Sequence, residues 1–254
     1  MSTKRHILIT GAAKGIGRAV AETFTHEAGN RLILLDRDYS VLCQWLEDAH
    51  PAAEVHAYPA DIANLPDLRE LFHLLAEQHG HVDVLVNSAG ICDENEPDDI
   101  DNWHKVIAVN LNGSFYVTAL CQPLLTDGGR IINMASILGR AGKVRNTAYC
   151  ASKHGLVGMT KALALDLAPR RITVNAILPA WVDTPMLQQE LALQASTAGL
   201  ALEQIQRNAK KKLPLRRFIE SREVAALVRY LASPEAAGLT AQSLVLDGAV
   251  ALGM

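Results

Sequence analysis

The stretch TGAAKGIG, residues 10–17, lies between a short apolar run and a helical pattern. The run before it, HILIT (6–10), has the length of a buried strand, and apolar residues recur at helical spacing over 15–29. Its three glycines leave out side chains where a backbone must turn tightly and approach a ligand. Strand, glycine-rich turn and helix in this order predict a phosphate-binding loop, where the helix N-terminus offers free N–H groups to a pyrophosphate.

The same alternation of strand and helix continues along the chain. Further strands are expected at 31–36, 54–61, 83–90, 129–136, 171–178 and 243–248, with helices between them. Continuous apolar strands are typical of a parallel sheet that is covered on both faces. The sequence therefore predicts an α/β, Rossmann-type fold with a doubly wound parallel seven-stranded sheet and helices on both faces, as one domain over 1–254.

One segment departs from this rhythm. Residues 185–213 are rich in helix formers but are interrupted by Gly199, where the pattern would otherwise lead straight to the last helix. We expect two short helices that form a lid over a binding site, with fixed surface packing as the alternative.

Composition limits the classes of partner. The chain carries 24 Lys and Arg against 27 Asp and Glu, a net charge of -3, so no basic excess indicates nucleic acid or an anionic membrane surface. The four cysteines are widely spaced and predict neither a metal site nor disulfides. No run approaches the length of a membrane span, and the apolar run at the N-terminus is too short for a signal peptide. We expect a cytoplasmic protein.

Asp36 ends the second expected strand, about 20 residues beyond the glycine loop, where an acid hydrogen-bonds the adenosine ribose. Its carboxylate would repel a 2′-phosphate, which favours NAD as cofactor. Lys14 and Arg37 are basic and could bind that phosphate, so NADP is the less favoured alternative.

The stretch TAYCASKHG (147–155) places Tyr149 and Lys153 four residues apart, on one face of the expected helix. An ammonium group beside a phenol favours its ionised form. Most such pairs are solvated neighbours, so the spacing by itself does not indicate catalysis.

Together, these motifs resemble the short-chain dehydrogenase/reductase family over nearly the whole chain. In order, they are TGAAKGIG, Asp61–Ile62, NSAG (87–90), Asn110, Ser136, Tyr149 with Lys153, and PAWVDTPM (179–186). The resemblance implies an NAD(P)-dependent enzyme that interconverts a secondary alcohol and a ketone by hydride transfer. It also implies a homotetramer, built by the helices that carry Asn110 and Tyr149 and by the last strand. A non-catalytic NAD-binding sensor or regulator on the same fold is the alternative.

The resemblance also implies a role for each catalytic residue. Tyr149 would be the general acid/base, and Lys153 would lower its pKa and bind the nicotinamide ribose. Ser136 would hydrogen-bond the substrate oxygen. Asn110 would hold a water that links Lys153 to solvent.

The remaining positions that the resemblance implies surround the two ligands. The cofactor would contact Gly11, Lys14, Gly15, Ile16, Gly17, Asp36, Arg37, Asp61, Ile62, Asn87, Ala89, Gly90, Tyr149, Lys153, Pro179, Val182 and Thr184. The substrate would contact Ser136, Leu138, Arg145, Asn146, Tyr149 and Ala180. No metal is expected.

The substrate itself stays open at this point. The C-terminal part is similar to D-3-hydroxybutyrate dehydrogenases, but Leu138 and Asn146 stand where those enzymes carry the histidine and lysine that help to hold a carboxylate. Small hydroxy acids, sugar alcohols and 3-oxoacyl thioesters are all candidates. The basic loop ILGRAGKVRN (137–146) could bind an anionic substrate, or it could be an exposed or subunit-contacting charged loop.

Overall fold

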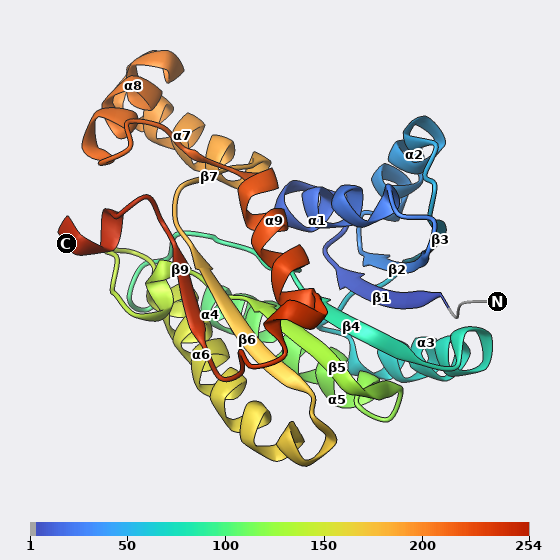
Figure 1. The fold of residues 1–254 in the computed structure, drawn as a ribbon. Coiled ribbons are helices and arrows are strands. Elements are labelled where there is room, and N and C mark those ends of the chain that lie inside the picture. Colours follow the sequence, from blue (N-terminus) through green and yellow to red (C-terminus); the bar gives the residue numbers. More distant parts are fainter. Residues whose placement is uncertain (1–3, 254) are drawn as a thin grey trace.

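The computed structural model describes residues 4–253 and is built on a seven-stranded sheet (Figure 1). The strands lie in the order β3-β2-β1-β4-β5-β6-β9, and every neighbouring pair is parallel. Their bounds are β1 Arg5–Thr10, β2 Asn30–Asp36, β3 Glu54–Pro59, β4 Val82–Asn87, β5 Leu125–Met134, β6 Thr173–Pro179 and β9 Ser243–Leu246. The prediction of a doubly wound parallel sheet of seven strands is confirmed.

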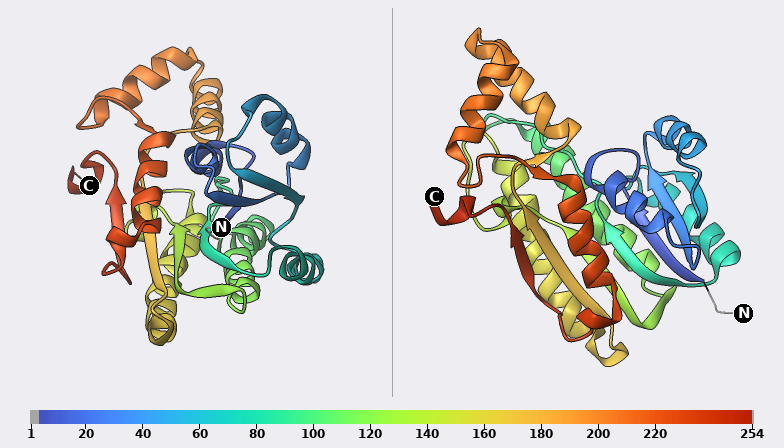
Figure 2. Two further views of the ribbon diagram at one scale, coloured as in Figure 1. Left: turned by 45° about the vertical axis from the view of Figure 1, so that its right-hand side comes forward. Right: turned by 45° about the horizontal axis from the view of Figure 1, so that its top comes forward.

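Helices cover both faces of this sheet (Figures 1 and 2). One face carries α1 (Gly15–Thr25), α2 (Tyr39–Ala49) and α9 (Ser221–Ala232). The other carries α3 (Leu65–His79), α4 (Ile100–Ile107), α5 (Ser114–Cys121) and α6 (Thr147–Leu167). Side chains of successive strand residues point to opposite faces, so Ile7 and Ile9 join one apolar core and Leu8 joins the other. Two covered faces explain why strands such as β1 and β2 contain continuous apolar runs rather than an alternating pattern.

The parallel strands all end at one edge of the sheet, here called the carboxyl edge. Thr10, Asp36, Asn87, Met134 and Pro179 are the last residues of β1, β2, β4, β5 and β6. Strand order reverses beside β1, with β2 on one side and β4 on the other. Loops leave in opposite directions at such a point and open a crevice for a ligand. The opposite edge, where the strands begin, is called the amino edge.

The helix that carries Asn110 is not a uniform α-helix. A π-helical segment, Ala108–Gly113, joins α4 directly to α5. Asn110 lies inside it and is fully buried. Such a widened turn is uncommon and often accompanies a functional site. The sequence predicted a helix here but not this change of its hydrogen-bonding pattern.

Two helices, α7 (Pro185–Ala198) and α8 (Leu202–Lys212), project from the rest of the molecule (Figures 1 and 2). The expected interruption at Gly199 is present, since this residue ends α7 with a φ of 65°. A two-stranded sheet that the sequence did not predict, β7 (Val182–Asp183) with β8 (Ile219–Glu220), joins the two ends of this segment. Trp181 stacks on Phe218 beside it, with ring centroids 6.2 Å apart.

Two predicted boundaries differ from the structure by several residues. The first helix was expected to reach residue 29 but ends at Thr25, because His26 leads into a turn before β2. The fifth strand was expected to begin at 129 but begins at Leu125, with Gly128 in the left-handed region inside it. Among residues 4–253, none of the helices combines the length and the apolar character needed to cross a membrane.

Candidate active site

Two cavities meet at the carboxyl edge of the sheet. The first has a volume of about 440 Å³ and follows the glycine loop, the end of β2 and the loop after β4. The second has a volume of about 390 Å³ and lies between the end of β5, the start of α6 and α7. Ile16, Cys92, Thr184 and Met186 line both, so the cavities are adjacent.

The glycine loop leaves no room for side chains at two of its positions. Gly11 has a φ of 69°, and a Cβ there would lie 2.7 Å from the Ala89 Cα. A Cβ on Gly17 would lie 2.1 Å from the carbonyl oxygen of Gly11. Both distances are shorter than any non-bonded carbon contact allows, so the close approach of loop, helix and β4 requires glycine.

The N-terminus of α1 faces the first cavity with free backbone donors. Lys14, the residue before the helix, makes no side-chain cap, and the first turn contains no acidic side chain. The first N–H groups of a helix have no intrahelical partner and attract anions. An uncapped helix start behind a tight glycine loop fits a dinucleotide diphosphate.

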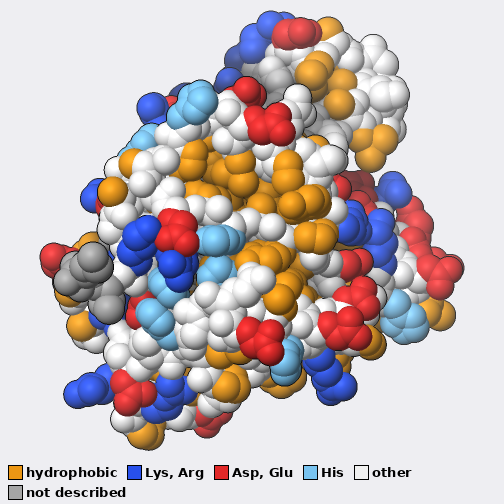
Figure 3. Space-filling view, turned by 90° about the vertical axis from the view of Figure 1, so that its right-hand side faces the viewer, with side chains coloured by type: hydrophobic (Ala, Val, Ile, Leu, Met, Phe, Trp, Pro, Cys, Tyr) orange, Lys and Arg blue, Asp and Glu red, His pale blue; other side chains and the backbone are white. Residues whose placement is uncertain are grey.

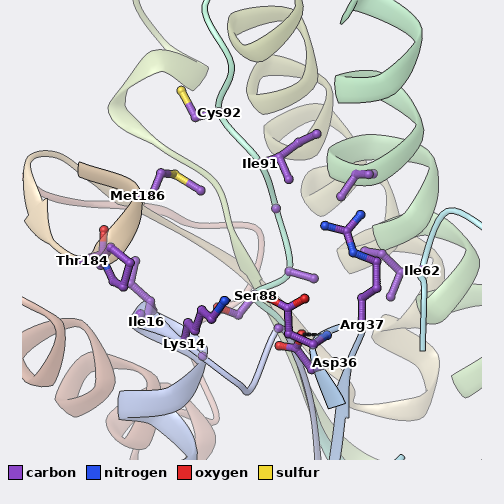
Figure 4. A pocket seen from close by; sticks show the side chains of 18 of the residues that line it. Lys14, Ile16, Asp36, Arg37, Ile62, Ser88, Ile91, Cys92, Thr184 and Met186 are labelled. Carbon is purple, nitrogen blue, oxygen red and sulfur yellow. Dashed lines mark hydrogen bonds and ion pairs between the residues drawn. The ribbon is translucent and has the colours of Figure 1, made fainter. Parts of the chain in front are cut away.

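Asp36 is held rigidly at the other end of this cavity (Figure 4). Its two carboxylate oxygens accept hydrogen bonds from the backbone N–H groups of Ala13, at 2.7 Å, and Asp38, at 2.8 Å. Lys14 pairs with the Asp38 carboxylate at 2.7 Å, which lowers the pKa of Asp38. The charge of Lys14 is therefore already partnered, whereas the Asp36 carboxylate faces the cavity.

The structure gathers most of the expected cofactor residues around the first cavity. Its lining includes Gly11, Lys14, Gly15, Ile16, Gly17, Asp36, Arg37, Asp61, Ile62, Ala89, Gly90 and Thr184. Tyr149, Pro179 and Val182 line the second cavity. Asn87 lines neither, because it is buried and donates to Thr118 and Asn133, both at 2.9 Å. Its contacts are those of a residue that ties β4 to β5.

Tyr149, Ser136 and Lys153 lie together beside the second cavity. Tyr149 is in the first turn of α6, and Ser136 follows β5, where its hydroxyl accepts from the Leu138 N–H at 3.2 Å. The Lys153 Nζ is 5.4 Å from the centre of the Tyr149 ring and donates to the Met134 carbonyl at 2.8 Å. Helical spacing in α6 and the end of β5 thus bring three polar groups to one point.

Burial shifts the pKa values of this pair in opposite directions. It raises the pKa of Tyr149, with smaller contributions from Cys92 and Glu190, while a hydrogen bond to Ser136 acts to lower it. Burial also lowers the pKa of Lys153 to about 8. We expected Lys153 to lower the pKa of Tyr149, but in this structure burial dominates and the pKa of Tyr149 is raised.

The side chain of Asn110 is tied to the loop after β4. Its side chain donates to the Ile91 carbonyl at 2.9 Å and accepts from the Ile91 N–H at 2.8 Å. The same amide nitrogen donates to Ser152 at 3.2 Å. The side-chain amide thus has protein partners, and the expected role of Asn110 in holding a water stays a prediction. This amide fixes the loop at Gly90, where a Cβ would lie 3.3 Å from the Asn110 Oδ1 and 3.6 Å from the Lys153 Nζ.

The expected substrate residues are brought together with one exception. Ser136, Leu138, Asn146, Tyr149 and Ala180 line the second cavity. Arg145 lines neither cavity and pairs with Glu96 at 2.7 Å.

The other two cations of the basic loop also have internal partners. Arg140 donates to the Ser243 carbonyl at 2.8 Å, and Lys143 lies 2.6 Å from Glu190. Of the three cations in this loop, only Lys143 lines the cavity, and its charge is paired with that of Glu190.

Several lining residues were missed by the sequence analysis. Cys92 lies two residues after the NSAG motif, and Trp181 follows Pro179 and Ala180. Met186, Leu187 and Glu190 share one face of α7 at spacings of three and four, a pattern that was visible in the sequence. The direction in which that face points could not be deduced, because it depends on how α7 packs.

The described residues, 4–253, contain no group of three or more His, Cys, Asp or Glu side chains that could hold a metal ion. The four cysteines are all free thiols. Burial raises the pKa of Cys92 to about 11, so this thiol is protonated near neutral pH.

Comparison with known proteins adds three relatives and a family. Residues 11–250 match the family model described as enoyl-(acyl carrier protein) reductase. The D-beta-hydroxybutyrate dehydrogenase of Rhizobium meliloti is 34% identical over 250 residues, covering 95% of this chain and 96% of that protein. The granaticin polyketide synthase putative ketoacyl reductase 1 of Streptomyces violaceoruber is 38% identical over 251 residues, covering 95% and 91%. A crystal structure of a variant actinorhodin polyketide ketoreductase with NADPH superposes with a TM-score of 0.92 at 35% identity, covering 99% of each chain.

Proposed function

The chain belongs to the short-chain dehydrogenase/reductase family, and from this premise we propose that it interconverts a secondary alcohol and a ketone. One observation carries the proposal. Tyr149 and Ser136 line a cavity that directly adjoins the cavity behind the glycine loop. A proton donor thus lies where a substrate would meet the end of a bound dinucleotide.

In the direction of reduction, the Tyr149 hydroxyl donates its proton to the substrate carbonyl oxygen as negative charge develops there. The Ser136 hydroxyl donates a hydrogen bond to the same oxygen and stabilises that charge. In oxidation, Tyr149 takes the proton from the alcohol. Hydride transfer is the chemistry that a bound nicotinamide cofactor supplies.

Lys153 serves this proton transfer by its charge and its fixed position. Its pKa of about 8 leaves the ammonium group largely protonated near neutral pH. The Met134 carbonyl orients it, and the buried surroundings strengthen its field at the Tyr149 ring. Lys153 therefore opposes the effect of burial on Tyr149 and stabilises the phenolate when the proton leaves.

We propose NAD as the preferred cofactor because of Asp36. Its carboxylate is fixed by two backbone N–H groups at the end of the cavity where an adenosine ribose would lie. Hydroxyls of that ribose can donate to the carboxylate, whereas a 2′-phosphate would be repelled. Arg37 also lines this cavity and supports NADP as the second candidate, the phosphorylated form with which the actinorhodin ketoreductase structure was solved.

We also propose that the chain forms one domain and assembles as a homotetramer. Large apolar side chains are exposed on the helices expected to pair: Phe115 on α5 is 49% exposed and Leu165 on α6 is 75% exposed. Val245 on β9, the last strand, is 40% exposed. Exposed apolar side chains on three elements support an interface. A monomer mass from light scattering at micromolar protein would contradict it.

The function is tested by following the absorbance of the reduced nicotinamide with a panel of ketones and secondary alcohols, using both cofactors. We expect turnover with NADH for at least one uncharged ketone, and a lower kcat/KM with NADPH. Calorimetry with each dinucleotide separates catalysis from binding. Tight binding of NAD without turnover across the panel would support the sensor alternative instead.

A further inference from the structure

A charged pair forms part of the wall of the second cavity. Lys143, in the loop after Ser136, and Glu190, on α7, both line this cavity. The Lys143 Nζ lies 2.6 Å from the Glu190 Oε1. Both side chains are partly shielded, at 35% and 23% exposure, so water screens the pair less than a surface ion pair. The pair spans two elements that are distant in sequence and faces the substrate side of Tyr149.

Further contacts hold this pair in place. The Glu190 Oε1 also accepts a hydrogen bond from Gln194 at 3.2 Å, one turn along α7. Glu94 lies 4.0 Å from the Lys143 Nζ on the other side. Glu94 is also 3.9 Å from the Arg145 Nε, so the close partner of the Lys143 charge is Glu190.

The Glu190 charge also acts on the reacting group. Together with burial, it raises the pKa of Tyr149, and it raises that of Cys92. An anion bound in this cavity would lie close to the Glu190 carboxylate, whose negative charge already acts on Tyr149 and Cys92. The rest of the wall is largely apolar: Ile137, Leu138, Ala180, Trp181, Val182 and Leu187 all line it.

We propose that the Lys143–Glu190 pair selects substrates whose cavity-bound part is uncharged and that it rejects carboxylates. A substrate carboxylate would have to take Lys143 from Glu190, leaving a shielded acid without its cation, or remain beside Glu190 unpaired. Either choice costs free energy that a neutral ester or ketone group does not require. The inference rests on the proposed function and narrows its substrate class.

Among the classes left open by the sequence, this pair disfavours small hydroxy acids. It is compatible with 3-oxoacyl thioesters and other neutral ketones, because their charge, if any, lies outside the cavity. The basic loop is then not an anion site, since its one cation in the wall is committed to Glu190.

The test compares acetoacetate with ethyl acetoacetate. Both are ketones, but one CH2 group away from the reacting carbonyl carbon the first carries a carboxylate and the second a neutral ester. We expect kcat/KM for reduction to favour the ester by at least about tenfold, the factor that roughly 1.4 kcal/mol produces. Glu190→Gln removes the acid and frees Lys143, so the ratio of ester to acid should fall by about tenfold. Asp127→Asn, which removes the acid 2.9 Å from Arg170 outside both cavities, is the matched control and should leave the ratio unchanged.

Binding provides a second readout that does not depend on turnover. Calorimetry with ethyl 3-hydroxybutyrate and 3-hydroxybutyrate on the NAD-loaded chain should show the same preference and the same response to Glu190→Gln. This ratio judges the pair even if the chain proves to be a non-catalytic NAD-binding protein. A wild-type preference for either carboxylate, a ratio unmoved by Glu190→Gln, or no binding of the neutral ester would overturn the proposal.

Discussion

The two edges of the sheet both bury titratable side chains, and both cavities described above open at the carboxyl edge. At the carboxyl edge, Tyr149 and Lys153 are buried beside the second cavity, and burial shifts the pKa of each. At the amino edge, His6, His56, His79 and His81 form a histidine cluster beneath the starts of β1, β3 and β4. The side of the molecule on which β1 begins shows histidines among basic and acidic side chains (Figure 3).

The rings of the histidine cluster pack against one another and against Tyr58. His6 stacks on His81 with ring centroids 3.9 Å apart, and His79 meets His56 edge-on at 4.8 Å. The Tyr58 hydroxyl lies 2.8 Å from the His79 Nε2. Burial lowers the pKa of His79 to about 4, so the ring is neutral at physiological pH.

The contrast shows what separates a site from a buried cluster. Burial is the largest cause of the pKa shifts of Tyr149 and His79, one at each edge. A shifted pKa therefore does not by itself identify a catalytic residue. At the carboxyl edge, Tyr149 and Ser136 line a cavity that a substrate can enter, and the Lys153 ammonium group lies beside the Tyr149 ring. At the amino edge, the rings converge on one another. Function therefore follows the place where loops diverge at the strand ends.

The largest expected effect is at the carboxyl edge. Tyr149→Phe should lower kcat by about 10³-fold, because only the proton-transfer group is removed. Affinity for NAD, measured by calorimetry, should stay close to that of the wild type. Tyr58→Phe removes the corresponding hydroxyl at the amino edge and should leave kcat unchanged. An equal loss of kcat in both variants, or near wild-type kcat in Tyr149→Phe, would contradict the assignment of catalysis to the carboxyl edge.

A smaller effect is expected at the far end of the first cavity. Asp36→Ala should narrow the preference for NAD over NADP by about tenfold or more in kcat/KM, because a repulsive charge next to the 2′-phosphate is lost. Asp48→Ala removes an exposed acid on α2 and controls for the change in net charge. If the wild type already prefers NADP, Arg37 outweighs Asp36 and the cofactor assignment is wrong.

The histidine cluster should affect the pH dependence of the free energy of unfolding rather than turnover. The folded pKa of His79 lies below its ordinary value near 6.5, because of burial and the nearby charges of His56, Arg31 and His6, with Glu54 opposing them. The unfolded chain therefore binds the extra proton first. Stability is full above about pH 6.5 and is lost as the pH falls towards 4, by roughly 1–3 kcal/mol.

Urea unfolding at several pH values tests this expectation. His79→Gln cannot take up the proton, so its free energy of unfolding should fall less than that of the wild type between about pH 7 and pH 4.5. His73→Gln, on the exposed side of the same helix, is the control and should follow the wild type. Identical slopes for all three proteins would show that His79 titrates normally.

The smallest expected effect concerns α7 and α8. Binding of NAD and a ketone should slow amide exchange severalfold over 186–212, as the segment closes over the second cavity. The histidine cluster, whose residues line neither of the two cavities, should show no such change. Exchange in the free chain as slow as in the central strands would make the segment a fixed wall.

Much of the fold could be predicted because its signals are local. Strands such as β1 and β2 contain apolar runs, and Gly11 and Gly17 mark a loop that has no room for a Cβ at these two positions. By contrast, β7 and β8 contain two residues each, which is too few to carry a period. The π-helical turn at Asn110 has no distinct composition, so the sequence shows a polar residue in a helix and no more.

The candidate site divides in the same way. Tyr149 and Lys153 could be paired from their spacing, because one helix carries both. Lys143 and Glu190 are 47 residues apart, and only the packing of α7 against the loop after β5 brings them together. The contact of Asn110 with Ile91 likewise depends on how the π-helical segment packs against the loop after β4, rather than on a motif.

The short paired strands β7 and β8 have one more consequence. They bring the point where the chain departs, at Asp183, next to the point where it returns, at Ile219. The ends of the segment between them are held together by this pairing. Its length and composition can therefore change without shifting the register of the main sheet. Such an anchor allows the substrate side of the site to change while Tyr149, Ser136 and Lys153 keep their places in the fold. For the engineer, it marks two cut points at which the segment from a related enzyme can be transplanted.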